Sequence, residues 1–140
     1  MRERCIYSVH SATANTRCSG KWSGAGQPSC DECQAGKVSA AGAASCLTTC
    51  VGGTYAAAGA ATCNPCPPGQ FSLDGAEKCE NCVAGKFSFE RSHECVFCAA
   101  GNYSGVGAPA CNVCNATAGL VSPESGMETC DYCGPGKRAD

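Results

Sequence analysis

The sequence predicts a small disulfide-rich fold, mostly irregular with short β-hairpins, built as an elongated tandem-repeat rod with no large hydrophobic core. Three observations predict this class: the cysteine content, the regular spacing of the cysteines and the scarcity of large apolar side chains. Sixteen of the 140 residues are cysteine, a share typical of disulfide scaffolds. Most of them form close pairs along the chain: Cys30/Cys33, Cys46/Cys50, Cys63/Cys66, Cys79/Cys82, Cys95/Cys98, Cys111/Cys114 and Cys130/Cys133.

The spacing between successive pairs is nearly constant. Twelve residues separate the second cysteine of one pair from the first cysteine of the next in five successive intervals, and only the interval from Cys114 to Cys130 is longer, at fifteen. A constant period indicates one small unit copied in tandem. The chain is therefore expected to be an array of small, similar units.

Large apolar side chains are too few to build one core. Nine residues are aromatic, and the 44 % hydrophobic content is mostly alanine and cysteine. Apolar burial contributes roughly 25 cal/mol per Å², whereas ordering each residue costs about 1–2 kcal/mol. A bridge that closes a loop of about 14 residues contributes roughly 3 kcal/mol in the chain-entropy description. Cross-links are therefore expected to take the place of a core.

Each unit carries the same residues at fixed positions, summarised as C-x-x-C-x-x-G-x-(F/Y)-S-x-x-x-G-A-x-x-C. The first glycine is Gly36, Gly53, Gly69, Gly85 or Gly101, and the β-forming residue after it is Val38, Tyr55, Phe71, Phe87 or Tyr103. The second glycine is Gly42, Gly59, Gly75, Gly107 or Gly126, and Arg91 interrupts this series. Glycine permits positive φ in tight turns, so each unit is predicted to be a short β-hairpin with a bridge at its base.

The repeat divides the chain into three parts. Residues 1–29 hold degenerate N-terminal units, residues 30–114 hold the regular cysteine-rich repeats of about 16 residues, and residues 115–140 hold a final repeat with an insertion and a C-terminal tail. No linker rich in proline or serine interrupts the array, so we expect one continuous array rather than separate domains.

Sequence alone leaves the disulfide connectivity open, and two schemes fit the spacing. In the sequential scheme the second cysteine of each pair joins the first of the next, which leaves Cys5 and Cys133 over. In the interlocked scheme successive pairs join first to third and second to fourth. We favour the interlocked scheme because it uses every cysteine: Cys5–Cys30, Cys18–Cys33, Cys46–Cys63, Cys50–Cys66, Cys79–Cys95, Cys82–Cys98, Cys111–Cys130 and Cys114–Cys133.

Composition restricts the compartment and the partners. Disulfide-dense chains belong to oxidising compartments, which favours an extracellular or cell-surface location. The net charge of −2 argues against nucleic acid or an anionic membrane surface as partner. No apolar run is long enough to insert into a membrane. Residues 1–4 are mostly charged and no apolar segment follows them, as a signal peptide would require, so we interpret the sequence as a piece of a longer secreted chain.

The chemistry-bearing residues predict no enzyme and no cofactor. His10 and His93 stand alone in irregular segments, and the acidic residues keep no fixed repeat position. Zinc is the main alternative, because two C-x-x-C pairs about 12–20 residues apart can also form a four-thiolate site. An intracellular zinc-binding module with four such sites therefore stays open as a reading of the same cysteines.

Two further features mark candidate surface sites. Asn102 and Asn115 each begin an N-x-S/T sequon and are glycosylation candidates. Phe89 and Phe97 fall outside the repeated aromatic position, close to Arg91. These three residues form either a larger local core or an exposed contact patch.

The motif resembles the ephrin type-A/B receptor-like cysteine-rich repeat, which is similar in style to tumour-necrosis-factor-receptor and furin-like modules. The segments that match best are Cys66-Pro67-Pro68-Gly69-Gln70-Phe71-Ser72 and Cys82-Val83-Ala84-Gly85-Lys86-Phe87-Ser88, within a resemblance that covers residues 15–133. It implies a disulfide ladder that spaces or presents other parts of a large extracellular protein. It transfers no ligand-contact residue.

The predicted function is therefore a non-enzymatic structural segment, such as a stalk or spacer, of a secreted or cell-surface protein or of a filamentous assembly. Its expected partners are other protein subunits or copies of itself, with glycans as a further class. The alternative from a different class is a receptor or adhesion ectodomain that binds a protein or a glycan.

Overall fold

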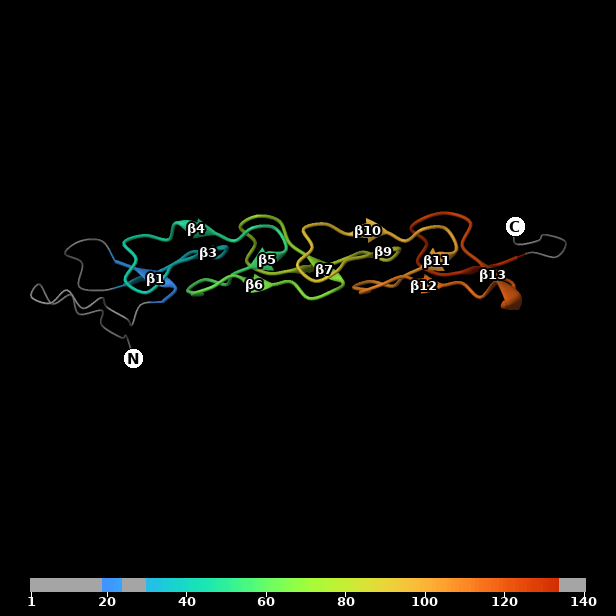
Figure 1. Ribbon diagram of the computed structural model, residues 1–140, viewed down its shortest axis with the longest axis horizontal. Helices are drawn as coiled ribbons and strands as arrows, with labels where there is room; N and C mark the ends of the chain where they lie inside the picture. The colour runs from blue at the N-terminus through green and yellow to red at the C-terminus, as the bar shows by residue number, and fades with distance from the viewer. Residues whose placement is uncertain (1–18, 24–29, 134–140) are drawn as a thin grey trace, which may run out of the picture. The chain divides into compact units, whose positions relative to one another are not determined.

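The computed structural model describes residues 19–23 and 30–133. These residues belong to two compact bodies. Of the described residues, those up to Pro65 and Leu73–Lys78 form the first body, and Cys66–Ser72 and those from Cys79 onward form the second. Both bodies are built from the same kind of hairpin (Figure 1).

Strands of two residues pair into seven antiparallel hairpins in the described part of the chain. In the first body these are β1 (Lys21–Trp22) with β2 (Asp31–Glu32), β3 (Lys37–Val38) with β4 (Thr48–Thr49), and β5 (Thr54–Tyr55) with β6 (Asn64–Pro65). In the second body they are β7 (Gln70–Phe71) with β8 (Glu80–Asn81), β9 (Lys86–Phe87) with β10 (Val96–Phe97), β11 (Asn102–Tyr103) with β12 (Asn112–Val113), and β13 (Leu120–Val121) with β14 (Asp131–Tyr132). The predicted class of short hairpins in a mostly irregular, disulfide-rich fold is confirmed.

Each hairpin pairs the segment after the first motif glycine with the residues inside the next cysteine pair. In hairpin β9–β10, Phe87 lies opposite Val96 and Lys86 lies opposite Phe97. The turn before β9 is closed by a hydrogen bond of 3.2 Å from the Lys86 N–H to the Val83 carbonyl. Gly85 has φ +79° in this turn, the left-handed conformation that the third position of a type II turn requires. The predicted role of the first glycine is therefore confirmed.

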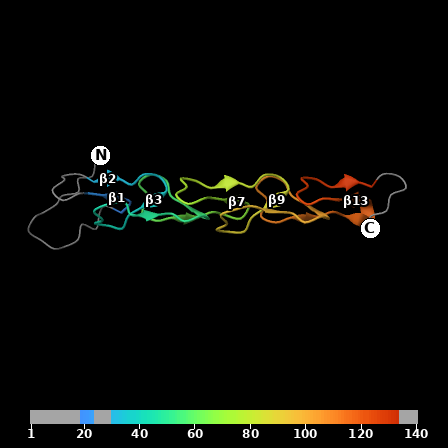
Figure 2. The same ribbon diagram turned by 90° about the horizontal axis from the view of Figure 1, so that it is seen from above.

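Successive hairpins within a body are joined by main-chain hydrogen bonds. In the second body the N–H groups of Gly69, Gly85 and Gly101 donate to the carbonyls of Ser88, Ser104 and Ser122, each one hairpin further on, at 2.9, 2.8 and 2.7 Å. The first body repeats this pattern, since the Gly36 N–H donates to the Ala56 carbonyl at 2.7 Å. The hairpins therefore follow one another in sequence order, from β7 through β9 to β13 in the second body (Figure 2).

The interior consists of sulfur and small side chains. The largest fully buried side chains of the described residues are Cys33, Cys50, Cys66, Cys82, Cys98, Ser88 and Ser104. In the first body, Val38, Cys50 and Ala56 form a small cluster of buried apolar residues. The expectation that no large hydrophobic core forms is confirmed for the described residues.

The disulfides follow the sequential scheme, and the favoured interlocked scheme is wrong. The described bridges are Cys33–Cys46, Cys50–Cys63, Cys66–Cys79, Cys82–Cys95, Cys98–Cys111 and Cys114–Cys130. They replace the predicted pairs Cys18–Cys33, Cys46–Cys63, Cys50–Cys66, Cys79–Cys95, Cys82–Cys98, Cys111–Cys130 and Cys114–Cys133. Cys133 has a free thiol. Cys30 is disulfide-bonded, but Cys5, its predicted partner, lies outside the described residues.

In hairpin β9–β10 the pleat of the strand accounts for this pairing. Cys95 and Cys98 flank the two residues of β10, and side chains three positions apart on an extended strand point to opposite sides. Cys95 therefore faces back to Cys82 in its own hairpin, whereas Cys98 faces forward to Cys111 in the next one. Interlocking would require both cysteines of a pair to face the same neighbouring pair.

Candidate functional site

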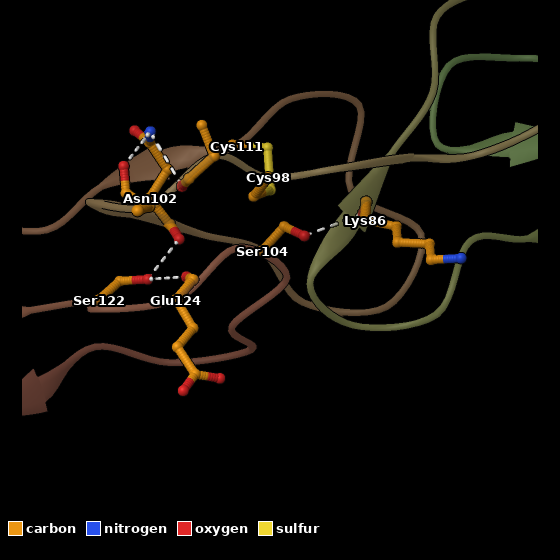
Figure 3. Close-up of a disulfide and its surroundings, with 9 residues drawn as sticks. Lys86, Cys98, Asn102, Ser104, Cys111, Ser122 and Glu124 are labelled. Carbon is orange, nitrogen blue, oxygen red and sulfur yellow. Dashed lines mark hydrogen bonds between the residues drawn. A yellow bond between two sulfur atoms is a disulfide. The ribbon is translucent and has the colours of Figure 1, made fainter.

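A side-chain interaction that recurs between hairpins is the hydrogen bond of a buried serine hydroxyl. Ser104 Oγ donates to the main-chain carbonyl of Lys86 at 2.9 Å, from one hairpin back to the preceding one (Figure 3). The other bonds of this kind are Ser39 to Lys21, Ser88 to Gln70 and Ser122 to Asn102, at 3.0, 2.8 and 3.0 Å. Each hydroxyl satisfies a strand carbonyl that a hairpin this short cannot pair internally. This serine ladder holds neighbouring hairpins in a fixed register.

A second contact joins hairpins two units apart. A Cβ placed on Gly85 would lie 1.9 Å from the Gly126 carbonyl oxygen, and one on Gly69 would lie 2.1 Å from the Gly107 carbonyl oxygen. The same approach in the first body places Gly36 against Gly75. These positions therefore require glycine for two reasons: the backbone has positive φ, and a second backbone approaches too closely for a Cβ atom. Sequence reasoning recognised only the turn.

Arg91 occupies a glycine position of the repeat. It is the one non-glycine residue with positive φ among the described residues, at +62°. Its N–H donates to the Cys66 carbonyl at 2.9 Å, as the Gly107 and Gly126 N–H groups do to Cys82 and Cys98. Residue 91 therefore has the same backbone conformation and hydrogen bond as the glycines at this motif position. The arginine side chain is exposed, and its left-handed backbone conformation is strained.

The predicted contact patch of Phe89, Arg91 and Phe97 lies on one hairpin, β9–β10. Phe89 is 66 % exposed and Phe97 is 60 % exposed, so the interpretation as a larger local core is wrong. The Phe89 ring packs edge-on against Phe87, with 5.3 Å between ring centroids. These three side chains are available at the surface of the second body.

A cation lies over one of these rings. The Lys86 Nζ atom is 4.1 Å from the centroid of Phe97, its cross-strand partner, a geometry that favours a cation–π contact. Phe97 also reaches the hairpin two units on, because a Cβ on Gly126 would lie 2.7 Å from the Phe97 ring. Lys86 was not singled out from sequence. The signal in the sequence was its motif position: the residue directly after the first glycine pairs with the second of the two residues between the next two cysteines, which here is Phe97.

The two sequons occupy different environments. Asn102 lies on β11, with its hydroxyl residue Ser104 buried in the serine ladder. Asn115 is the N-cap of the 3₁₀ turn η1 (Ala116–Ala118), and its sequon residues are exposed. This turn contains part of the insertion predicted in the final repeat. Both sites match the N-x-S/T pattern, but the structure buries the hydroxyl residue of one and exposes that of the other.

The described residues show no constellation for metal chemistry. No group of three or more His, Cys, Asp or Glu side chains that could hold an ion occurs within residues 19–23 and 30–133. The cysteines that a four-thiolate zinc site would use are joined as disulfides in this range, except Cys133. His93 is exposed in a loop, and His10 lies outside the described residues. In the same ranges no helix has the length and apolar character that crossing a membrane demands.

Comparison with known protein families and with characterised proteins finds no match to this chain.

Proposed function

We propose that the chain is a non-enzymatic structural segment of an extracellular or cell-surface protein, working as a spacer that holds other parts of the protein, or neighbouring subunits, apart. The observation that carries this proposal is the repetition of the contacts between hairpins. The same glycine N–H and serine hydroxyl bonds recur from one hairpin to the next in the second body. In repeat proteins of this kind, stability is the sum of similar neighbour interactions, and no single position is set apart for chemistry.

The disulfides support the compartment in this proposal. Six bridges occur among the described residues, and disulfide-dense chains persist in oxidising environments such as the extracellular space. Disulfides are rare in the cytosol, where glutathione and thioredoxin keep thiols reduced. The resemblance to ephrin-receptor-like repeats also supports a spacer function, because those arrays serve as stalks.

Small-angle scattering of the purified, oxidised chain tests the spacer function. We expect a maximum dimension several times the cross-sectional diameter, and the same profile after addition of small-molecule or glycan mixtures. A compact particle would contradict the proposal. Intact mass under non-reducing conditions provides the second measurement, because free thiols with bound zinc would support the intracellular alternative instead.

The exposed aromatic side chains favour one second candidate, an adhesion ectodomain that binds a protein. Phe89 and Phe97 are exposed on one hairpin, and aromatic residues are enriched in protein–protein interfaces. This function predicts that Phe89→Ala weakens attachment of the chain to cell surfaces while its thermal stability is unchanged. Val113→Ala, at a position 78 % exposed on the hairpin β11–β12, is the matched control. Equal attachment by both variants would contradict it.

A further inference from the structure

The sequon at Asn115 is displayed on an exposed turn. The Asn115 Oδ1 atom accepts hydrogen bonds from the Thr117 N–H at 3.1 Å, the Thr117 hydroxyl at 2.5 Å and the Ala118 N–H at 3.3 Å. These bonds fix the side-chain amide by its oxygen. The Nδ2 atom makes no hydrogen bond to any part of the chain that the structure describes. The nucleophilic nitrogen and the neighbouring hydroxyl are therefore presented together at the surface.

The sequon at Asn102 is built into the array. Its Nδ2 atom donates to the carbonyls of Ala99 and Ala100 at 3.3 and 3.5 Å. The hydroxyl residue Ser104 is 0 % exposed and donates to the Lys86 carbonyl. The Asn102 carbonyl accepts the hydroxyl of Ser122 from the following hairpin (Figure 3). An enzyme could engage both Asn102 and Ser104 only after this hairpin had separated from both of its neighbours.

We propose that Asn115 is an N-glycosylation site of this protein and that folding of the array protects Asn102 from the same modification. The co-substrate is an oligosaccharide linked through N-acetylglucosamine to a polyprenyl diphosphate. The Asn115 Nδ2 atom attacks C1 of that sugar, a C–N bond forms, the C–O bond to the diphosphate breaks, and one Nδ2 proton passes to solvent. The polyprenyl diphosphate leaves, and no group is oxidised or reduced.

The hydrogen bonds that make the Asn102 sequon inaccessible form only when the array folds. Before the bridges form, both sequons lie in an unstructured chain and are equally accessible. Cys98–Cys111 closes a loop that contains Asn102 and Ser104, and Cys114–Cys130 closes one that contains Asn115 and Thr117, so the bridges alone do not distinguish the two sequons. The bonds to Lys86 and Ser122 then bury the hydroxyl and occupy the backbone. Asn115 keeps its exposure in the folded state, because its turn lies outside the serine ladder. The difference between the two sites therefore depends on oxidation.

This inference rests on the proposed extracellular function, since the transfer takes place in the secretory pathway. The test uses the full chain behind a cleavable signal sequence in cultured animal cells. The secreted product is analysed by intact mass before and after treatment with peptide-N-glycosidase, without reductant, so that bridges and glycans are counted on the same molecules. The variants are Asn115→Gln, Asn102→Gln, Thr117→Ala and Thr117→Ser.

The expected result is a single glycan on the wild-type chain. Asn115→Gln and Thr117→Ala lose it, whereas Asn102→Gln and Thr117→Ser keep it, because serine also completes the sequon. Dithiothreitol added during synthesis keeps the thiols reduced, and Asn102 is then modified as well. A chain that holds the six described bridges but carries no glycan at Asn115, or that is modified equally at both sites when oxidised, would overturn this inference. Reduced thiols at the cysteines of those six bridges would instead contradict the proposed function.

Discussion

The Ser104 hydroxyl donates a hydrogen bond of 2.9 Å to the carbonyl of Lys86, in the preceding hairpin, from a side chain with no exposed surface. A hairpin with two residues in each strand has few hydrogen bonds of its own. Its main-chain groups are therefore satisfied by the next hairpin, and the serine is the side chain that makes this connection.

Replacement of Ser104 by alanine should destabilise the chain by about 1 kcal/mol, the typical net value of one hydrogen bond. The loss reflects both the missing bond and the carbonyl left without its partner. Urea denaturation of the oxidised protein measures it. Ser125→Ala changes an exposed serine of the same body and should leave the midpoint unchanged. Equal midpoints for the two variants would show that the serine ladder contributes no stability.

Gly85→Ala and Gly101→Ala form a matched pair that isolates the contact between hairpins two units apart. Both glycines have positive φ, +79° and +85°, so each substitution costs about 1–2 kcal/mol for the left-handed conformation. A Cβ on Gly85 also meets the Gly126 carbonyl, whereas one on Gly101 has no atom of the described chain within 4 Å. Gly85→Ala should therefore cost a further ~1–3 kcal/mol for the steric overlap.

Thermal unfolding of the two glycine variants, monitored by circular dichroism, makes this comparison. Because both proteins carry the same substitution at the same motif position, their difference reports the contact alone. Indistinguishable transitions would mean that the hairpins two units apart do not approach each other in solution.

Arg91→Gly should stabilise the protein by about 1 kcal/mol, because glycine adopts the left-handed conformation without steric cost. The hydrogen bond from the residue 91 N–H to the Cys66 carbonyl is retained in this variant. Arg91→Ala removes the side chain but keeps the strain, so it should give no gain. If both variants raise the unfolding temperature equally, the side chain rather than the backbone is responsible.

Removal of one bridge by the double substitution Cys98→Ser and Cys111→Ser should cost roughly 3 kcal/mol, the value for a loop of about 15 residues. The variant should retain the remaining bridges, because each closes its own hairpin. Proteolysis without reductant followed by mass spectrometry checks the wild-type connectivity. Recovery of a peptide that links Cys82 to Cys98 would support the interlocked scheme against the structure.

The hairpins themselves could be predicted from local residues. The turn before β9 needs a residue with positive φ, and Gly85 is placed where the turn requires it. Phe87 and the two residues between Cys95 and Cys98 then fall into register as short strands. These features involve few residues, and the same local chemistry recurs in every unit. The fold class followed because local rules repeated at a constant period are enough to define such an array.

The serine ladder had a signal in the sequence that was not interpreted. Ser39, Ser72, Ser88 and Ser104 stand at one position of the repeat, directly after the β-forming residue. A small polar residue that recurs at one structural position is a candidate for a buried hydrogen bond. Its acceptor could not be named, because the carbonyl belongs to another hairpin and its position depends on how hairpins pack.

The sequence by itself determined the repeat, the hairpin turns and the dependence on cross-links, because each follows from residues close together in the chain. Only the tertiary structure decided which cysteines join, which glycines face a second backbone and which sequon remains exposed. These depend on the direction in which side chains leave a strand and on the contacts between hairpins. The two N-x-S/T motifs at Asn102 and Asn115 acquire different surroundings only when Ser104 is buried against Lys86 and Thr117 is left at the surface.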